Sequence, residues 1–86
     1  MICYLISYDL HNQRQYGDLI AEIRAFPHTK VHASTWMVVT DLDAHQLYTR
    51  LAQHIDEDDS LFVLRSGRDA AWSLVEGDVE WLHRWL

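Results

Sequence analysis

The sequence predicts an α+β domain of the ferredoxin-like type, with the element order strand, helix, strand, strand, helix, strand. A long apolar run opens the chain, two segments carry apolar residues at helical spacing, and the segments between and after them are rich in β-branched and aromatic residues. In this fold both helices pack on one face of a four-stranded sheet. An apolar opposite face would then require a partner or an added segment to cover it.

The length of the chain predicts a single domain with a small hydrophobic core. Of its 86 residues, 49% are hydrophobic, which suits one core and is too little for two domains. We expect one domain over residues 1–86, with a core at 1–66 and a C-terminal arm with a short helix at 67–86. So small a domain buries only about 60–65% of its unfolded surface. Four tryptophans and four tyrosines are more large rings than it comfortably encloses, which predicts a homodimer.

The first strand is the clearest element. Residues Met1 to Leu10 are almost continuously apolar and end at Asp9, which is typical of a central strand covered on both faces. A polar turn at 11–15 follows, and then apolar residues recur with helical spacing until Pro27 ends the helix. These residues are Tyr16, Leu19, Ile20, Ile23 and Phe26.

The middle of the chain predicts two strands and a second helix. The segment from Lys30 to Thr40 favours two strands joined tightly near residues 33–35, and His28 and His32 are expected to share one strand face. Asp43 with Gln46 has the spacing of a capping box, which starts a helix that runs to about residue 54. An acidic turn at 56–59 and a short apolar strand at 60–65 complete the pattern.

The C-terminal segment extends beyond the predicted fold. Residues 69–75 are compatible with a fifth strand or with an arm that lies on the open sheet face. Asp78 is placed to cap a last short helix, whose apolar residues would face something apolar. These residues are Val79, Leu82 and Trp85 or Leu86.

Charge and cysteine content restrict the class of protein. Seven basic residues, scattered along the chain, face thirteen acidic ones, for a formal net charge of −6. This balance disfavours strong non-specific binding of nucleic acid, although a local basic patch across a dimer remains compatible with it. The single cysteine, Cys3, excludes an internal disulfide and favours a cytoplasmic protein. We expect neither a signal peptide nor a membrane span.

Asp9 is the first candidate for chemistry, because the end of a central strand holds a side chain rigidly at the rim of the sheet. One carboxylate cannot hold Mg²⁺, but two Asp9 side chains across a dimer axis, together with waters, could do so. Capping of the following turn is the commoner role of an aspartate at this place.

Other polar residues give weaker signals. His11 lies two residues from Asp9, so a metal-binding or general-base role is conceivable, but no histidine pair has a recognised metal spacing. The acidic run at 56–59 lacks the pattern of a calcium loop and predicts a solvated turn. Ser34 lies at the strand junction without a nucleophile motif, which favours a hydrogen-bonding role.

Two stretches carry a family resemblance. YLISYDL at residues 4–10 and ASTWMVVTDLDA at 33–44 resemble the small Cas2-like CRISPR-associated adaptation proteins and, more closely, short bacterial proteins described as SinR-like or Cas2-like. The resemblance covers about residues 2–65. It implies a ferredoxin-like fold that dimerises through the open sheet face. Some members are Mg²⁺-dependent nucleases, others act as non-catalytic adaptors in spacer acquisition, and the related VapD-like proteins are RNA-cleaving toxins.

Specific residues follow from this resemblance. It implies that Asp9 takes the catalytic and metal-binding place, and that Ser34 takes the place of the serine in the second stretch. If the protein is a nuclease, we expect Arg14 or Lys30 to steady a phosphate, a role that the resemblance itself does not assign, so that Arg14, Lys30 and Ser34 are the predicted nucleic-acid-binding residues. RNA, DNA or a protein partner remain open, as does a non-catalytic adaptor role. The Trp-rich tail from Trp72 to Leu86 has no clear counterpart.

Overall fold

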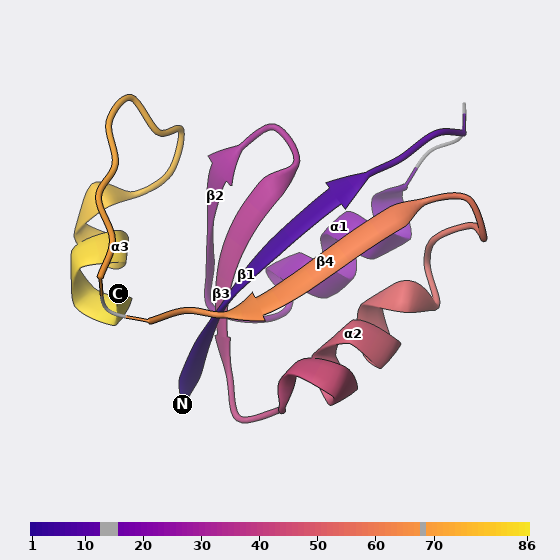
Figure 1. Ribbon diagram of the computed structural model, residues 1–86, viewed down its shortest axis with the longest axis horizontal. Coiled ribbons are helices and arrows are strands. Elements are labelled where there is room, and N and C mark those ends of the chain that lie inside the picture. The colour runs from indigo at the N-terminus through magenta and orange to yellow at the C-terminus, as the bar shows by residue number, and fades with distance from the viewer. Residues whose placement is uncertain (13–15, 68) are drawn as a thin grey trace.

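The computed structural model describes residues 1–12, 16–67 and 69–86 as a four-stranded antiparallel sheet with three helices (Figure 1). The strand order is β2-β3-β1-β4, and each neighbouring pair is antiparallel. This confirms the α+β class and is compatible with the predicted ferredoxin-like arrangement. The elements are β1 (Ile2–Asp9), α1 (Gly17–Arg24), β2 (His28–His32), β3 (Thr35–Thr40), α2 (Ala44–Ala52), β4 (Ser60–Arg65) and α3 (Val79–Trp85).

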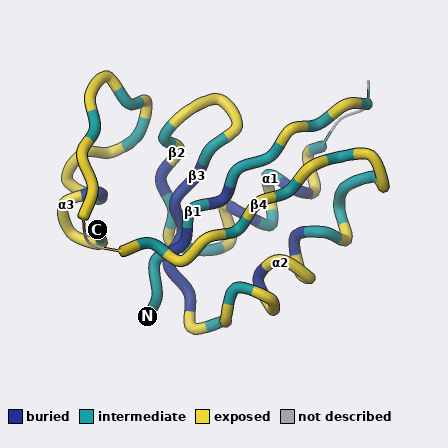
Figure 2. The backbone as a smooth tube through the Cα atoms, in the orientation of Figure 1, coloured by how far each residue is buried: buried dark blue, intermediate teal, exposed yellow. Residues whose placement is uncertain are grey.

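One face of the sheet packs against α1 and α2 and forms the main core. Alternate residues of a strand point to opposite faces, so Tyr4 and Ile6 of β1 turn toward the helices and are almost fully buried. In Figure 2 the buried positions follow β1, β3 and the inner sides of the two helices. The buried cluster on this face consists of Tyr4, Ile6, Leu19, Ile23, Trp36, Val38, Leu47 and Leu51.

The start of α2 confirms the predicted capping box. The Asp43 carboxylate accepts a hydrogen bond from the Gln46 backbone N–H at 2.8 Å, and the Gln46 side chain accepts one from the Asp43 N–H at 2.9 Å. This exchange satisfies backbone donors that would otherwise have no partner in the first turn. It fixes the phase of the helix so that Leu47 and Leu51 face the sheet.

The opposite face of the sheet is only half covered. After β4 the chain runs as an arm, without a further strand among its described residues, and then forms α3 (Figure 1). Leu82 of α3 is buried, as are Met37 and Val39 on this side of β3. Phe62 and Leu64 of β4 remain 56% and 52% exposed. The arm therefore covers part of the face and leaves the part around β4 open.

Two expectations for the tail and for β2 need correction. Of the predicted apolar set on α3, Leu82 is buried and Leu86 is half-buried, and both line the cavity under the arm, whereas Val79 and Trp85 are exposed. His28 and His32 do not share a face. The register of β2 against β3 shifts between Lys30 and His32, and this bulge turns His32 toward the arm while His28 contacts Trp36 on the helix side.

The helices do not suggest a membrane span. Within residues 1–12, 16–67 and 69–86, none of them is both long and apolar enough to cross a bilayer.

Candidate functional site

Asp9 ends β1 at the rim of the sheet. Tyr8 packs on the helix side, so by alternation Asp9 belongs to the other face. Its side chain is 76% exposed, and its Oδ2 lies 3.6 Å from Nε2 of His11. The backbone of Asp9 is paired with Ser60 of β4, which fixes its position. A carboxylate on a rigid strand end, open to solvent and beside an imidazole, can bind a cation or a proton donor.

The loop after Asp9 is tied to the turn before β4 through Asp59. The Asp59 carboxylate accepts hydrogen bonds from the His11 backbone N–H, the Tyr16 hydroxyl and the Asp56 backbone N–H, each at 2.8 Å. Desolvation acts to raise the pKa of the Asp59 carboxyl, but these hydrogen bonds outweigh it and lower the pKa below its ordinary value. The pKa of Tyr16 is raised by desolvation and by its bond to Asp59. Together, these hydrogen bonds to Asp59 hold the backbone of His11 in place next to Asp9.

The same turn brings three carboxylates together. Oxygens of Asp56, Asp58 and Asp59 lie within 4.8 Å of one another, a spacing that could hold a metal ion. The Asn12 side-chain amide donates to Asp56 at 2.9 Å and to Asp58 at 2.7 Å, so N–H groups already occupy part of this cluster. The predicted turn is therefore present, but its acids bind the β1–α1 connection. Sequence reasoning missed these contacts because the partners are more than 40 positions apart.

The predicted nucleic-acid-binding residues are not gathered in one place. Ser34, exposed in the turn between β2 and β3, accepts a backbone hydrogen bond from Tyr8 at 3.1 Å, so it lies at the same sheet end as Asp9. Lys30 pairs with Trp36, whose ring faces the helix side, and so lies on the face opposite to Asp9. Arg14 lies outside the described residues.

Lys30 has a basic neighbour that the sequence pattern did not reveal. Its Nζ lies 5.6 Å from the centre of the Trp36 ring, and the guanidinium carbon of Arg24, at the end of α1, lies 5.7 Å from the same centre. The His28 ring is tilted against Trp36 at 5.7 Å. These four side chains border a hollow of about 460 Å³, which the arm closes on another side. We call Arg24, His28 and Lys30 the basic patch.

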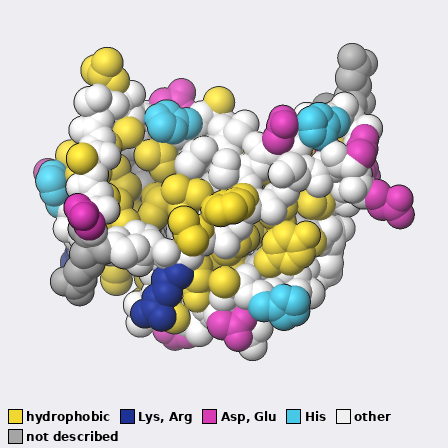
Figure 3. All heavy atoms as spheres, in the orientation of Figure 1, with side chains coloured by type: hydrophobic (Ala, Val, Ile, Leu, Met, Phe, Trp, Pro, Cys, Tyr) yellow, Lys and Arg dark blue, Asp and Glu magenta, His cyan; other side chains and the backbone are white. Residues whose placement is uncertain are grey.

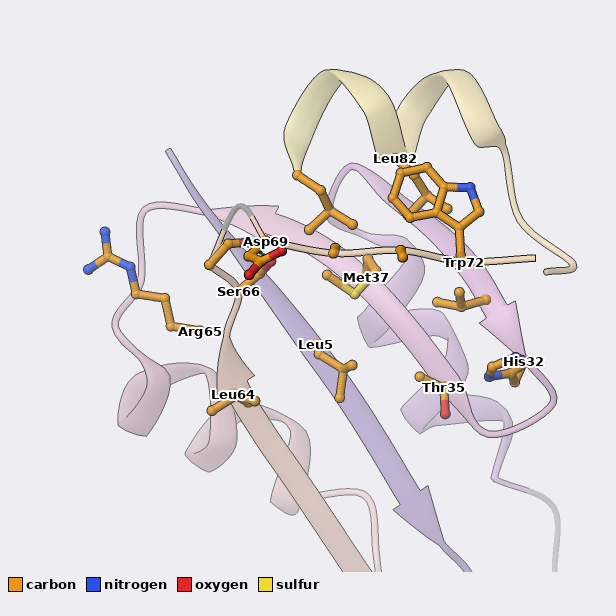
Figure 4. A pocket seen from close by; sticks show the side chains of 15 residues that line it. Leu5, His32, Thr35, Met37, Leu64, Arg65, Ser66, Asp69, Trp72 and Leu82 are labelled. Carbon is orange, nitrogen blue, oxygen red and sulfur yellow. Dashed lines mark hydrogen bonds between the residues drawn. The ribbon is translucent and has the colours of Figure 1, made fainter. Parts of the chain in front are cut away.

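A second cavity, of about 330 Å³, lies between the sheet and the arm. Figure 4 shows Leu5 and Met37 on the sheet side and Trp72 and Leu82 on the arm side. Apolar side chains also gather over the middle of this face (Figure 3), where Leu64 and Phe62 of β4 are exposed. Exposed apolar area of this kind commonly marks an interface.

Comparison with known proteins supports the resemblance seen in the sequence. The family model described as CRISPR associated protein Cas2 matches residues 1–72. The chain belongs to the Cas2 family. The match spans the whole sheet and the first part of the arm, and it suggests a CRISPR-associated role, whereas the finer SinR-like and VapD-like assignments are not supported by it.

A solved structure shares the fold of this chain. The hypothetical protein TT1823 from Thermus thermophilus superposes with a TM-score of 0.67, covering 90% of this chain and 98% of its own, at 15% identity. At that identity the similarity speaks to fold alone. No curated protein matches the sequence significantly.

Proposed function

We propose that this Cas2-family chain works as a homodimer in a prokaryotic defence system and cleaves RNA or DNA in a Mg²⁺-dependent reaction, with Asp9 as the catalytic and metal-binding residue. The observation that carries the proposal is the position of Asp9. Its carboxylate is exposed at the end of a central strand, on the sheet face that the helices leave uncovered. Two copies that meet over that face would bring two such carboxylates toward a common axis.

The residues around Asp9 fit Mg²⁺ only when two copies contribute. Carboxylate oxygens are hard ligands that suit this ion, which is commonly held by one or two carboxylates and several waters. Both oxygens of the neighbouring Asp59 already accept hydrogen bonds, so the partner's Asp9 is the better second ligand. A bound Mg²⁺ would supply a water of lowered pKa and stabilise charge on the phosphate.

The remaining predicted residues would position the substrate. The Ser34 hydroxyl is exposed at the sheet end that carries Asp9, where it can donate a hydrogen bond to a phosphate oxygen. Lys30 would bind a more distant phosphate, since it lies on the other face, and Arg14 is the third proposed contact. The nucleic acid would therefore pass around the β2 side of the domain.

The test is cleavage of labelled RNA and DNA with Mg²⁺ or EDTA. We expect metal-dependent cleavage that falls by about 100-fold or more in Asp9→Ala, because even groups that only orient metal ligands matter at the 10–100-fold level. Asp18→Ala removes an exposed carboxylate on α1 and should cleave normally. Light scattering should give the mass of two chains. Cleavage that persists in Asp9→Ala, or a monomer, would contradict the proposal.

A second candidate is a non-catalytic dimeric module that presents a surface to a protein or a nucleic acid. The net charge of −6 and the exposed Phe62 and Leu64 favour a protein partner. In that case the dimer is intact, no cleavage is seen with any metal, and Asp9→Ala leaves binding unchanged. The same set of measurements therefore separates the two candidates.

A further inference from the structure

The basic patch holds two cations that form no ion pair with any residue that the structure describes. Among the described residues, no carboxylate lies within ion-pair distance of Arg24 or Lys30, although both stand beside the Trp36 ring. Arg50, by contrast, is paired with Glu22 at 3.1 Å. Exposed cations that border one hollow are suited to an anion, and this hollow of about 460 Å³ has room for a phosphate group.

The C-terminal arm is seated directly against this patch. The Glu76 backbone N–H donates to the Val31 carbonyl at 3.0 Å, and the Asp78 N–H donates to the Thr29 hydroxyl at 2.7 Å. Between them, Gly77 approaches β2 so closely that a Cβ would stand 2.5 Å from Thr29 Oγ1 and 2.6 Å from the Lys30 carbonyl oxygen. The sequence permits this close contact because residue 77 has no side chain.

The seating brings acidic side chains to the basic patch. Glu76 and Asp78 are exposed and border the same hollow as Arg24 and Lys30. Residues 73–86 carry three acids, Glu76, Asp78 and Glu80, against one arginine, Arg84, and they lie beyond the part of the chain that the Cas2 family model matches. A negative segment is therefore placed where the domain would otherwise attract an anion.

We propose that Arg24 and Lys30 bind a backbone phosphate of nucleic acid and that the arm restrains this binding through Glu76 and Asp78. The proposal rests on the nucleic-acid binding assigned to Lys30 in the proposed function and adds Arg24 and a regulating segment to it. The negative charges of Glu76 and Asp78 at the edge of the hollow lower the positive potential there. The backbone of the arm, packed against β2, also narrows the access of a phosphate to the hollow. Displacement of the arm, or loss of its charge, opens the site.

The experiment measures binding of a short fluorescein-labelled single-stranded oligodeoxynucleotide to the full chain by anisotropy, in EDTA and at low salt. Glu76→Gln with Asp78→Asn should bind about five- to tenfold tighter, because two nearby negative charges are lost. The asparagine keeps an oxygen that can accept the Trp81 N–H at the start of α3. Arg24→Ala with Lys30→Ala should bind at least tenfold more weakly and show a smaller salt dependence by about one to two phosphate contacts.

Two variants separate a local effect from a change in total charge. Gly77→Ala leaves every charge in place but cannot seat against Lys30, so it should also tighten binding. Asp18→Asn with Asp69→Asn removes the same total charge away from the hollow and should change affinity less than twofold. Circular dichroism confirms that each variant is folded.

The results that would overturn the proposal are specific. The proposal fails if Glu76→Gln with Asp78→Asn binds no tighter than the natural sequence. It also fails if the gain persists undiminished when Arg24 and Lys30 are replaced as well. Because binding is measured in EDTA, an absence of cleavage contradicts the proposed nuclease without affecting this result. An absence of any measurable binding, even in Gly77→Ala, contradicts the phosphate site itself.

Discussion

The two faces of the sheet differ in how completely their side chains are buried. The face under α1 and α2 carries a continuous cluster of fully buried side chains, including Ile6, Val38 and Leu51. The other face is only partly covered, by an arm that forms one short helix, buries Leu82, and leaves a cavity beneath it. Stability is thus concentrated on the helix-covered face, which leaves the second face and its rim free to carry interactions.

The candidate chemistry follows this division. Asp9 is held by the pairing of the central strand, so its backbone depends on the well-packed region while its side chain reaches the open face. The arm makes only a few backbone contacts with β2, around Glu76 and Asp78. Segments with few buried apolar contacts open locally at low free-energy cost. The comparison therefore predicts that the arm can detach while the domain stays folded.

The largest expected effect tests where the stability resides. Leu51→Ala removes a fully buried side chain of α2 and should lower the free energy of unfolding by about 2–5 kcal/mol. Leu64→Ala on the open face should cost a single chain less than about 1 kcal/mol, since that side chain is 52% exposed. Urea denaturation at several protein concentrations checks both values.

The concentration dependence sharpens this test. If the loss in Leu64→Ala grows with protein concentration, a second copy covers Leu64 in the natural protein, as the proposed homodimer requires. Equal losses for the two variants at all concentrations would show that the faces do not differ in the way described.

A smaller effect is expected when the N-terminal caps of α2 and α3, one in each region, are removed in turn. Asp43→Ala removes the capping box of α2 and should cost about 1 kcal/mol of global stability. Asp78→Ala removes the cap of α3, which accepts the Trp81 N–H at 3.2 Å, and should mainly speed amide exchange in the arm. Denaturation and hydrogen exchange measure the two responses. A global loss in Asp78→Ala as large as that in Asp43→Ala would show that the arm belongs to the cooperative core.

Local sequence signals predicted the helix-covered half of the molecule well. The apolar run of β1, the box at Asp43 and the helical spacing before Pro27 all act within a few residues, and each matches the structure to within one or two positions. Periodicity failed at β2 because a bulge after Lys30 changes which side His32 faces, and such a shift depends on pairing with β3. Periodicity also did not distinguish a strand from an arm for residues 69–75. That difference depends on which part of the fold the segment packs against.

The candidate site was predictable only in part. Asp9 could be identified because the end of a buried strand is visible in the sequence, and the structure does place it exposed at the rim. The basic patch and the hydrogen bonds between Asn12 and the acidic turn could not be identified in this way, because each brings together residues from separate elements. The Cas2 resemblance pointed to Asp9 and Ser34, and the sequence did not show that Lys30 lies on the face away from Asp9.

The smallest expected effect concerns the ion pair between Glu22 of α1 and Arg50 of α2. The Arg50 guanidinium, hydrogen-bonded to Glu22 at 3.1 Å, lowers the pKa of the Glu22 carboxyl, and His54 at 3.5 Å adds to the effect. A carboxyl with a lowered folded-state pKa stabilises the protein above its unfolded pKa of about 4.3, and this contribution is lost as the pH falls through the folded value.

Glu22→Gln should therefore lower the free energy of unfolding at neutral pH by at most about 1 kcal/mol, as for other partly exposed ion pairs. The difference from the natural sequence should begin to shrink as the pH falls below the unfolded pKa of about 4.3 and should vanish once the pH is below the lowered folded-state pKa, where the natural carboxyl is protonated in both states. Denaturation curves across the acid range, repeated in an Arg50→Ala background, give the coupling free energy directly. A pH-independent difference, or one that survives unchanged without Arg50, would assign the effect to packing of the Glu22 stem and would make the helix-covered face stable through apolar contacts alone.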